Sequence, residues 1–127
     1  MLLNDFFIVD DLQKGIGSVR AMLHLDVRHP IFAGHFPGRP VVPGACLLQL
    51  VQELTASIGD GEVRLIKADL LKFITPIDPV RNGTIAMALT GKETRPGEWQ
   101  VTAEGSNAGA TCFRFKGSFR AGSDYAD

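Results

Sequence analysis

One histidine lies in a segment whose composition restricts the backbone on both sides of it. His35 falls within residues 29–44, sixteen residues that contain four prolines and three glycines. Proline fixes φ and glycine permits sharp bends, so we predict a stiff loop of tight turns here. A rigid connector would explain the prolines. It would not explain a histidine set between two glycines, so His35 is a candidate for chemistry.

The end of this segment predicts a second chemical feature, the start of a helix at Pro43 and Gly44. Proline suits a first helical turn because its missing N–H would have no partner there. Gly44 leaves the first N–H groups uncovered, at the positive end of the helix dipole. A carbonyl group placed at this point would be polarised.

The elements that must position these residues are one helix and several strands. Residues 44–58 are apolar around most of a helical circumference, and Gln49, Gln52 and Glu53 form a narrow polar stripe. A helix with this pattern is typically buried. Period-two alternation, short apolar runs and intervening turn residues predict strands in most of the remaining chain. These segments are 6–9, 18–27, 84–90, 99–104 and 111–120, with turns at 95–98 and 107–109.

Residues 62–73 form a less regular segment, because the apolar positions change face partway along it. Either a β-bulge or a strand buried on both faces would produce this shift. Together the elements predict an α+β fold in which one antiparallel sheet of five or six strands wraps around one long buried helix. The length of 127 residues fits a single domain spanning 1–127.

Composition excludes several classes of partner. The formal net charge is −1, so no global basic field would attract nucleic acid or an anionic membrane. The longest stretch without Lys, Arg, Asp or Glu, residues 40–52, is too short to span a bilayer. The acidic N-terminal region lacks the features of a secretory signal, so we expect a cytoplasmic protein. Cys46 and Cys112 then read as small buried residues.

The proline-rich segment and the helix start resemble the signature of a known family, the β-hydroxyacyl-acyl-carrier-protein dehydratases, hot-dog-fold enzymes of bacterial fatty-acid synthesis. A second, weaker resemblance is a Phe/Pro pattern that follows the central strand. The family usually ends this pattern with Gly-Asp, which is absent here. Close matches cover about residues 31–54, while the order of elements fits the hot-dog fold over the whole chain. The two motifs are Phe32-x-Gly34-His35-Phe36-Pro37-Gly38-x-Pro40-x-x-Pro43-Gly44 and Lys72-Phe73-x-x-Pro76-x-x-Pro79.

The resemblance implies roles for these residues and a reaction. His35 would be the general base that removes a proton from C2 of a 3-hydroxyacyl thioester, carried on acyl-carrier protein or coenzyme A. The backbone N–H of Gly44 would bind the thioester oxygen as negative charge develops. The resemblance implies no cofactor, and we expect no metal site at His24, His29 and His35, because no carboxylate or thiolate stands at ligand spacing. Substrate contacts would come from Phe36, Pro37, Gly38, Val42 and Pro43.

The chain departs from the family at one catalytic position. The family has Glu or Asp fourteen residues after the histidine, where this chain has Gln49. An amide can form hydrogen bonds but cannot act as a carboxylic acid, and general acid catalysis contributes roughly 10²–10⁴-fold. Glu53 lies one turn further along the helix, displaced by about 5 Å. Glutamine is common in the family at that later position, so the two residue types look exchanged. Pairing with a nearby base is the simpler interpretation of Glu53.

Three further functions fit the same residues. A site with only the histidine could isomerise a double bond or hydrolyse a thioester. The chain could instead be a non-catalytic subunit that binds acyl-carrier protein or a homologous partner. The family pairs two sheets edge to edge, so we expect a homodimer or a higher oligomer, or else a heterodimer.

Other polar residues have simpler interpretations. His24 is expected to be solvated, and His29 to serve the turn before Pro30. A basic strand face is usually solvated, although it could dock an acidic carrier, as could Arg39. That face consists of Arg114, Lys116 and Arg120.

Overall fold

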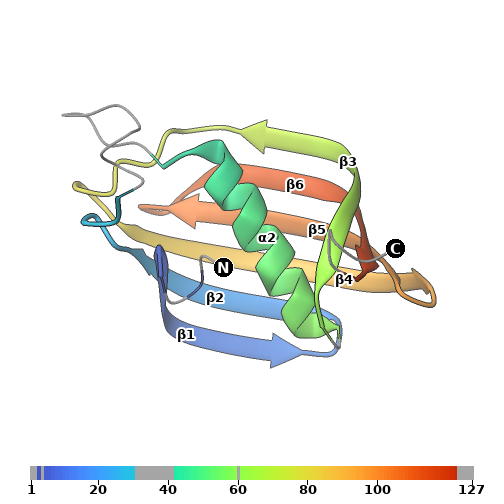
Figure 1. The fold of residues 1–127 in the computed structure, drawn as a ribbon. Helices are drawn as coiled ribbons and strands as arrows, with labels where there is room; N and C mark the ends of the chain where they lie inside the picture. The colour runs from blue at the N-terminus through green and yellow to red at the C-terminus, as the bar shows by residue number, and fades with distance from the viewer. Residues whose placement is uncertain (1–2, 4, 31–41, 60, 123–127) are drawn as a thin grey trace.

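The computed structural model describes residues 3, 5–30, 42–59 and 61–122. These residues form six strands and one helix, in a single antiparallel sheet of order β1-β2-β4-β5-β6-β3. The sheet curves around the helix, which lies across its inner face (Figure 1). The predicted α+β class and wrapped arrangement are therefore confirmed. The elements are β1 (Phe7–Gly15), β2 (Ser18–Leu25), α2 (Gly44–Ile58), β3 (Val63–Phe73), β4 (Thr84–Arg95), β5 (Glu98–Asn107) and β6 (Ala110–Ala121).

Helix α2 begins at Gly44 and ends at Ile58, as the sequence predicts. Cys46 N–H donates to the carbonyl oxygen of Pro43 at 3.0 Å, so proline occupies the position before the first helical hydrogen bonds. The apolar side of α2 packs on the inner sheet face and forms the core with it. The largest fully buried core side chains include Leu23, Leu50, Leu54, Ile85, Met87, Leu89, Phe113, Phe115 and Phe119.

Strand β3 contains the irregularity expected in residues 62–73. Its register with β6 shifts between Leu65 and Lys67 and again between Ala68 and Leu70. Gly117 of β6 lies against this segment, where an added Cβ would overlap the carbonyl oxygen of Lys67. The bulge interpretation is confirmed. The prediction of a strand buried on both faces is wrong, because β3 is the last strand of the sheet and most of its side chains are exposed.

Strand β1 differs from the predicted segment 6–9, because it continues to Gly15. It forms a hairpin with β2 through Gly17, whose φ of +66° suits glycine. Its register shifts between Val9 and Asp11, which marks a bulge. β1 is an edge strand that pairs only with β2 in this sheet.

The hairpin between β4 and β5 confirms the turn predicted at residues 95–98. Gly97 has a φ of +80°, and its N–H donates to Oε2 of Glu93 at 3.2 Å. Both strands extend beyond the predicted ranges, because the long hairpin continues to pair. Within the described residues, no helix is long and apolar enough to cross a membrane.

Candidate functional site

The start of α2 borders an apolar cavity. Gly44 is its first helical residue, and an added Cβ there would lie 2.6 Å from Cζ of Phe73. The missing side chain therefore lets the phenyl ring pack directly over the helix start. The cavity is about 270 Å³, slightly below the usual range for ligand pockets of about 300–1,000 Å³. Its lining residues are Val42, Gly44, Leu47, Phe73, Thr75, Pro76, Ile77 and Cys112.

Two segments far apart in sequence meet at this cavity. Val42 N–H donates to the carbonyl oxygen of Ile77 at 3.1 Å, which joins the segment before α2 to the loop after β3. Ile74 N–H donates to the carbonyl oxygen of Cys112 at 2.9 Å, and the rings of Phe73 and Phe113 are 5.5 Å apart. The Phe73–Pro79 motif, which the sequence presents only as a weak echo, thus supplies part of the wall beside Gly44.

The sequence-predicted site residues are only partly described by the structure. Gly44, Val42 and Pro43 lie at the helix start, and Val42 is buried. His35, Phe36, Pro37, Gly38 and Arg39 lie outside the described residues, so their roles remain predictions. The lining residues Phe73, Thr75, Pro76, Ile77 and Cys112 were missed as site residues, and the Phe/Pro spacing after β3 was the signal that pointed to them.

Gln49 and Glu53 form a hydrogen-bonded pair on α2. Nε2 of Gln49 donates to Oε2 of Glu53 at 3.0 Å, and Leu3 N–H donates to Oε1 of Glu53 at 2.9 Å. Glu53 is only 9% exposed. Two of the donors to its carboxylate are thus an amide and a backbone N–H, and the pairing with a base expected from the sequence stays a prediction. Glu53 therefore connects the N-terminal segment to the helix.

This pairing defines what Gln49 can offer a ligand. A carboxylate oxygen accepts hydrogen bonds, so the NH₂ group of Gln49 must face Glu53. The amide carbonyl oxygen and one N–H of Gln49 are left for other partners. These atoms can orient a hydroxyl group, but they cannot protonate it.

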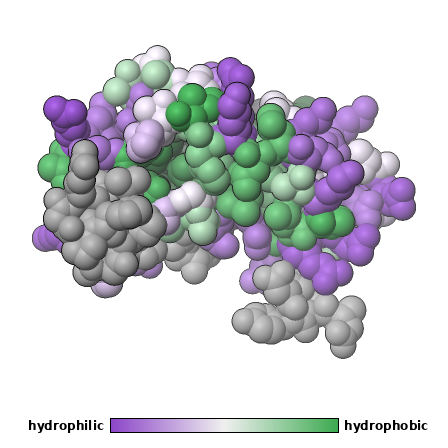
Figure 2. Space-filling view, turned by 90° about the horizontal axis from the view of Figure 1, so that it is seen from above, coloured by the Kyte–Doolittle hydropathy of each residue, from purple (hydrophilic) through white to green (hydrophobic). Residues whose placement is uncertain are grey.

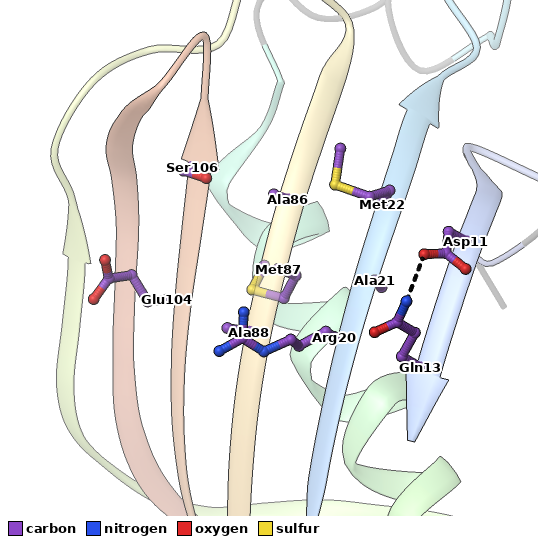
Figure 3. Close-up of a pocket in the computed structure, with 10 residues that line it drawn as sticks. All are labelled: Asp11, Gln13, Arg20, Ala21, Met22, Ala86, Met87, Ala88, Glu104 and Ser106. Carbon is purple, nitrogen blue, oxygen red and sulfur yellow. Dashed lines mark hydrogen bonds between the residues drawn. The ribbon is translucent and has the colours of Figure 1, made fainter. Parts of the chain in front are cut away.

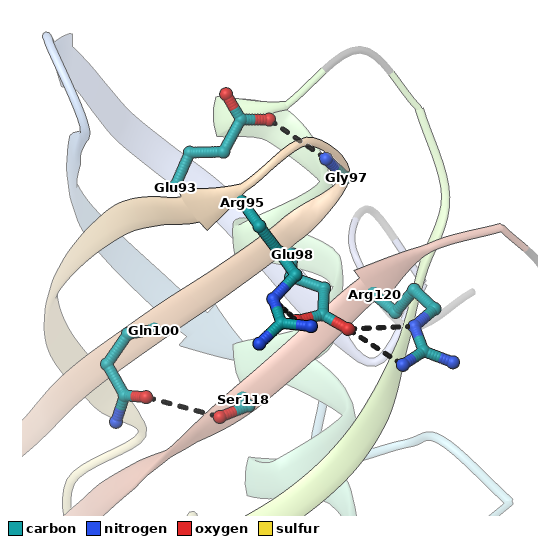
Figure 4. Close-up of polar contacts among 7 residues, drawn as sticks. All are labelled: Glu93, Arg95, Gly97, Glu98, Gln100, Ser118 and Arg120. Carbon is teal, nitrogen blue, oxygen red and sulfur yellow. Dashed lines mark hydrogen bonds and ion pairs between the residues drawn. The ribbon is translucent and has the colours of Figure 1, made fainter.

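Two of the three residues in the predicted basic face of β6 already have carboxylate partners. Nη2 of Arg120 lies 2.7 Å from Oε1 of Glu98, and Nε of Arg114 lies 3.7 Å from Oε2 of Glu104. Arg95 approaches the same Glu98, as Figure 4 shows. The hydrogen bond from Arg120 lowers the pKa of Glu98, with smaller electrostatic contributions from the two arginines. Much of the basic charge on this part of the sheet is therefore neutralised.

The other histidines have local partners. The ring of His24 contacts the carboxylate of Asp10 on β1 and lies within hydrogen-bond distance of Thr84, at 3.1 Å. Nε2 of His29 lies 3.2 Å from Oδ2 of Asp5. The ring of His29 also packs edge-to-face on Phe6, with ring centroids 5.2 Å apart. The His24 contacts join β2 to β1 and to the start of β4, and the His29 contacts join the segment after β2 to the segment before β1.

The two cysteines are free thiols and buried, as predicted. Burial raises the pKa of Cys46 and of Cys112. Because the thiolate is the reactive form, these side chains are poorly suited to act as nucleophiles.

A larger hollow of about 500 Å³ lies on the outer face of the sheet (Figure 3). Its floor is formed by the small residues Ala86 and Ala88 of β4, with Arg20 of β2 beside Ala88. No residue of α2 lines it. The cavity next to Gly44, in contrast, combines apolar walls with the start of the helix.

Comparisons with solved structures identify the fold. The fold matches the structure titled "The Dehydratase Heterocomplex ApeI:P" from Xenorhabdus doucetiae with a TM-score of 0.77 and 20% identity, over 90% of this chain and 97% of that one. A putative thioesterase from Ralstonia eutropha matches with a TM-score of 0.61 and 13% identity, over 91% of this chain and 84% of that one. The fold is therefore the hot-dog fold.

Sequence comparisons identify the family within this fold. The model of the ApeI-like family, described as ApeI dehydratase, matches residues 12–112. The 3-hydroxyacyl-[acyl-carrier-protein] dehydratases FabZ of Klebsiella pneumoniae and Salmonella arizonae are each 30% identical over 118 residues. These matches cover 88% of this chain and 71% of each relative. The chain belongs to the ApeI-like dehydratase family.

Proposed function

We propose that the chain dehydrates 3-hydroxyacyl thioesters carried by acyl-carrier protein or coenzyme A, in fatty-acid or related lipid or polyketide synthesis. The supporting observation is the apolar cavity of about 270 Å³ beside Gly44 at the start of α2. A thioester oxygen near Gly44 would meet a backbone N–H at the positive end of the helix dipole. The acyl chain would lie along Phe73 and Leu47.

In this proposal His35 is the general base. Its imidazole takes a proton from C2, a double bond forms between C2 and C3, and the C3 hydroxyl leaves. The proton received by the base must then reach the departing oxygen, so that one water molecule and one enoyl thioester are formed. Histidine titrates near neutral pH and can carry the proton in both directions.

Gln49 limits this reaction, because its amide orients a hydroxyl without supplying a proton. Glu53 is not a ready substitute, since its two oxygens already accept hydrogen bonds from Gln49 and Leu3. We therefore expect turnover slower than that of a variant with a carboxylic acid at position 49, by roughly 10²-fold or more.

We further propose that the protein assembles through the edge of β3. β3 is eleven residues long and ends the sheet, and a long edge strand with exposed apolar side chains requires cover. The side of the molecule that carries β3 shows hydrophobic atoms between hydrophilic ones (Figure 2). The exposed apolar residues of β3 are Ile66, Leu70, Leu71 and Phe73, at 41–50% exposure.

A second candidate function is that of a subunit in a dehydratase heterodimer, whose partner supplies the missing acid. The specific observation in its favour is the Gln49–Glu53 pair, which leaves α2 without a carboxylate that is available to a substrate. The matching structure from Xenorhabdus doucetiae is titled a dehydratase heterocomplex.

The test is to incubate the purified protein with 3-hydroxyacyl and enoyl thioesters and to follow the enoyl absorbance. The proposal predicts turnover that His35→Ala abolishes, while the control His24→Ala, on the outer strand face, retains it. Native turnover that survives His35→Ala would show the site assignment to be wrong. An inactive wild type with a strongly active Gln49→Glu variant would contradict the enzyme proposal and support the heterodimer. A product with a shifted double bond would indicate an isomerase, and a free acid would indicate a thioesterase.

A further inference from the structure

We propose that the β3 edge selects a homologous chain with an acidic edge strand over a second copy of itself. This inference rests on the proposed assembly through β3 and adds the chemistry of the partner. It is carried by the charges that β3 presents beside its exposed apolar side chains.

The pairing with β6 places the charges of β3 on the outer face of the sheet. Lys72 lies opposite Arg114, Lys67 opposite Ser118, and Arg64 opposite Arg120. Arg114 and Arg120 are exposed residues of the outer face, so their partners on β3 share it. Lys67 and Lys72 are themselves exposed, and Arg64 is partly exposed.

The acidic groups near this edge do not balance its cations. β3 carries Arg64, Lys67 and Lys72 but only one carboxylate, Asp69, which gives the strand a formal net charge of +2. The exposed Glu62, directly before the strand, lowers the formal net charge of the edge to +1. Nζ of Lys67 lies 3.3 Å from Oδ1 of Asp69. Among the described residues, Arg64 and Lys72 have no carboxylate within ion-pair distance.

The neighbouring strand reinforces this charge. Lys116 of β6 lies opposite Leu70 of β3 and is exposed, so it adds a further cation to the outer face next to this edge. The carboxylates that balance Arg114 and Arg120 are Glu104 and Glu98 on β5, on the side away from the β3 edge. The edge itself therefore presents positive charge to any incoming strand.

Pairing of this edge with a second copy would bring like charges together. A two-fold axis places the same surface on both sides of an interface, so two edges of net positive charge would meet. Like charges opposite each other on adjacent strands are destabilising, and lysines on an edge strand commonly prevent such pairing.

The apolar residues of the same edge nevertheless favour burial. Ile66, Leu70 and Leu71 are 41–45% exposed, which is costly in water if the edge stays open. A homologous strand that carries carboxylates would cover these residues and neutralise the cations at once. Repulsion against a second copy then provides specificity.

The test uses this chain to supply both edges. In the triple variant Arg64→Glu/Lys67→Glu/Lys72→Glu the edge is acidic. Sedimentation equilibrium measures the association. We expect the wild type and the variant each to self-associate weakly. Their equimolar mixture should form a 1:1 dimer whose affinity is at least about tenfold higher than that of either self-association. The difference should shrink in 1 M salt, where the screening length is about 3 Å. Circular dichroism checks that the variant is folded, and Lys72→Glu alone should shift association in the same direction by less.

The matched control is Lys14→Glu/Arg20→Glu/Lys92→Glu, which makes the same change in net charge on β1, β2 and β4. It should not bind the wild type more tightly than the wild type binds itself. A wild-type dimer as tight as the mixture, or equal binding by the control, would overturn the proposal. A salt-insensitive wild-type dimer that turns over thioesters would overturn only the charge selection. Charge-selective pairing without any turnover would overturn only the enzyme proposal.

Discussion

Glu53 and Glu98 occupy opposite sides of the sheet and are held in different ways. Glu53 is part of α2 on the inner side, is 9% exposed, and accepts hydrogen bonds from the uncharged donors of Leu3 and Gln49. Glu98 lies on the outer face and contacts two guanidinium groups, those of Arg95 and Arg120. The inner carboxylate satisfies buried donors, whereas the outer one takes part in ion pairs that water and salt weaken.

This difference matters for the proposed chemistry. Glu53 is hydrogen-bonded to Gln49, the position where the family has its acid. Its carboxylate has a structural task, because it attaches the N-terminal segment to α2. A group with that task cannot leave its donors without cost, so it is a poor candidate to shuttle protons. Three sets of variants test this contrast and one tests the buried thiols, in order of decreasing effect.

Removing the inner carboxylate should give the largest loss of stability. Glu53→Leu leaves the Leu3 N–H and the Gln49 amide without their acceptor, at a cost of about 1–3 kcal/mol. Urea denaturation measures this loss. The control Glu53→Gln keeps one acceptor oxygen and should lose less. Equal losses in the two variants would show that the acceptor function is unimportant.

Gln49→Glu should make stability depend on pH in a new way. The new carboxyl group would lie within hydrogen-bond distance of Glu53, so the pair must share a proton and one pKa rises in the folded state. The folded protein then binds a proton that the unfolded chain releases above a pKa of about 4.3. The free energy of unfolding should therefore fall, relative to wild type, as pH rises from about 4 through the raised pKa. A constant difference between pH 4 and 8 would contradict the pairing.

The buried thiols should add a smaller effect at alkaline pH. Burial raises the pKa of Cys46 and Cys112 in the folded protein. Between the unfolded thiol pKa of about 8.5 and the higher folded value, the unfolded chain loses protons that the folded protein keeps. Stability should therefore fall as pH rises through this interval. The double variant Cys46→Ala/Cys112→Ala should show a shallower decline, and an unchanged slope would contradict the assignment.

Removing the outer carboxylate should have the smallest effect. Glu98→Gln should change the melting temperature little at neutral pH, because the ion pairs are exposed. The lowered pKa of Glu98 means that its contribution is present above the unfolded pKa of about 4.3 and disappears as pH falls through the folded pKa. The difference from wild type should therefore vanish in acid. A loss as large as that of Glu53→Leu would reverse the comparison.

The sequence predicts the local features of this fold well. Pro43 and Gly44 mark the start of α2, and the apolar pattern marks its length, because both signals lie within the helix itself. The change of face in residues 62–73 likewise predicts the bulges of β3. Exposure of that strand was not predictable, because it depends on the position of β3 at the end of the sheet.

Contacts between distant segments could not be predicted from sequence patterns. The approach of Leu3 to Glu53 and that of Ile77 to Val42 depend on how the chain folds back. Strand register likewise decides which carboxylates partner the basic face of β6, and the sequence does not give that register. Arg114 and Arg120 lie opposite Glu104 and Glu98 only in the β5–β6 pairing that the structure shows.

The central claim is that Glu53 is committed to structure and that the chain lacks a helix acid at position 49. The most direct test compares 3-hydroxyacyl thioester dehydration by the wild type, Gln49→Glu and Glu53→Gln in one enoyl absorbance assay. The account predicts a gain of roughly 10²-fold or more for Gln49→Glu and little change for Glu53→Gln when both variants are folded. Loss of turnover in Glu53→Gln, with no gain in Gln49→Glu, would show that Glu53 is the acid and would contradict the account.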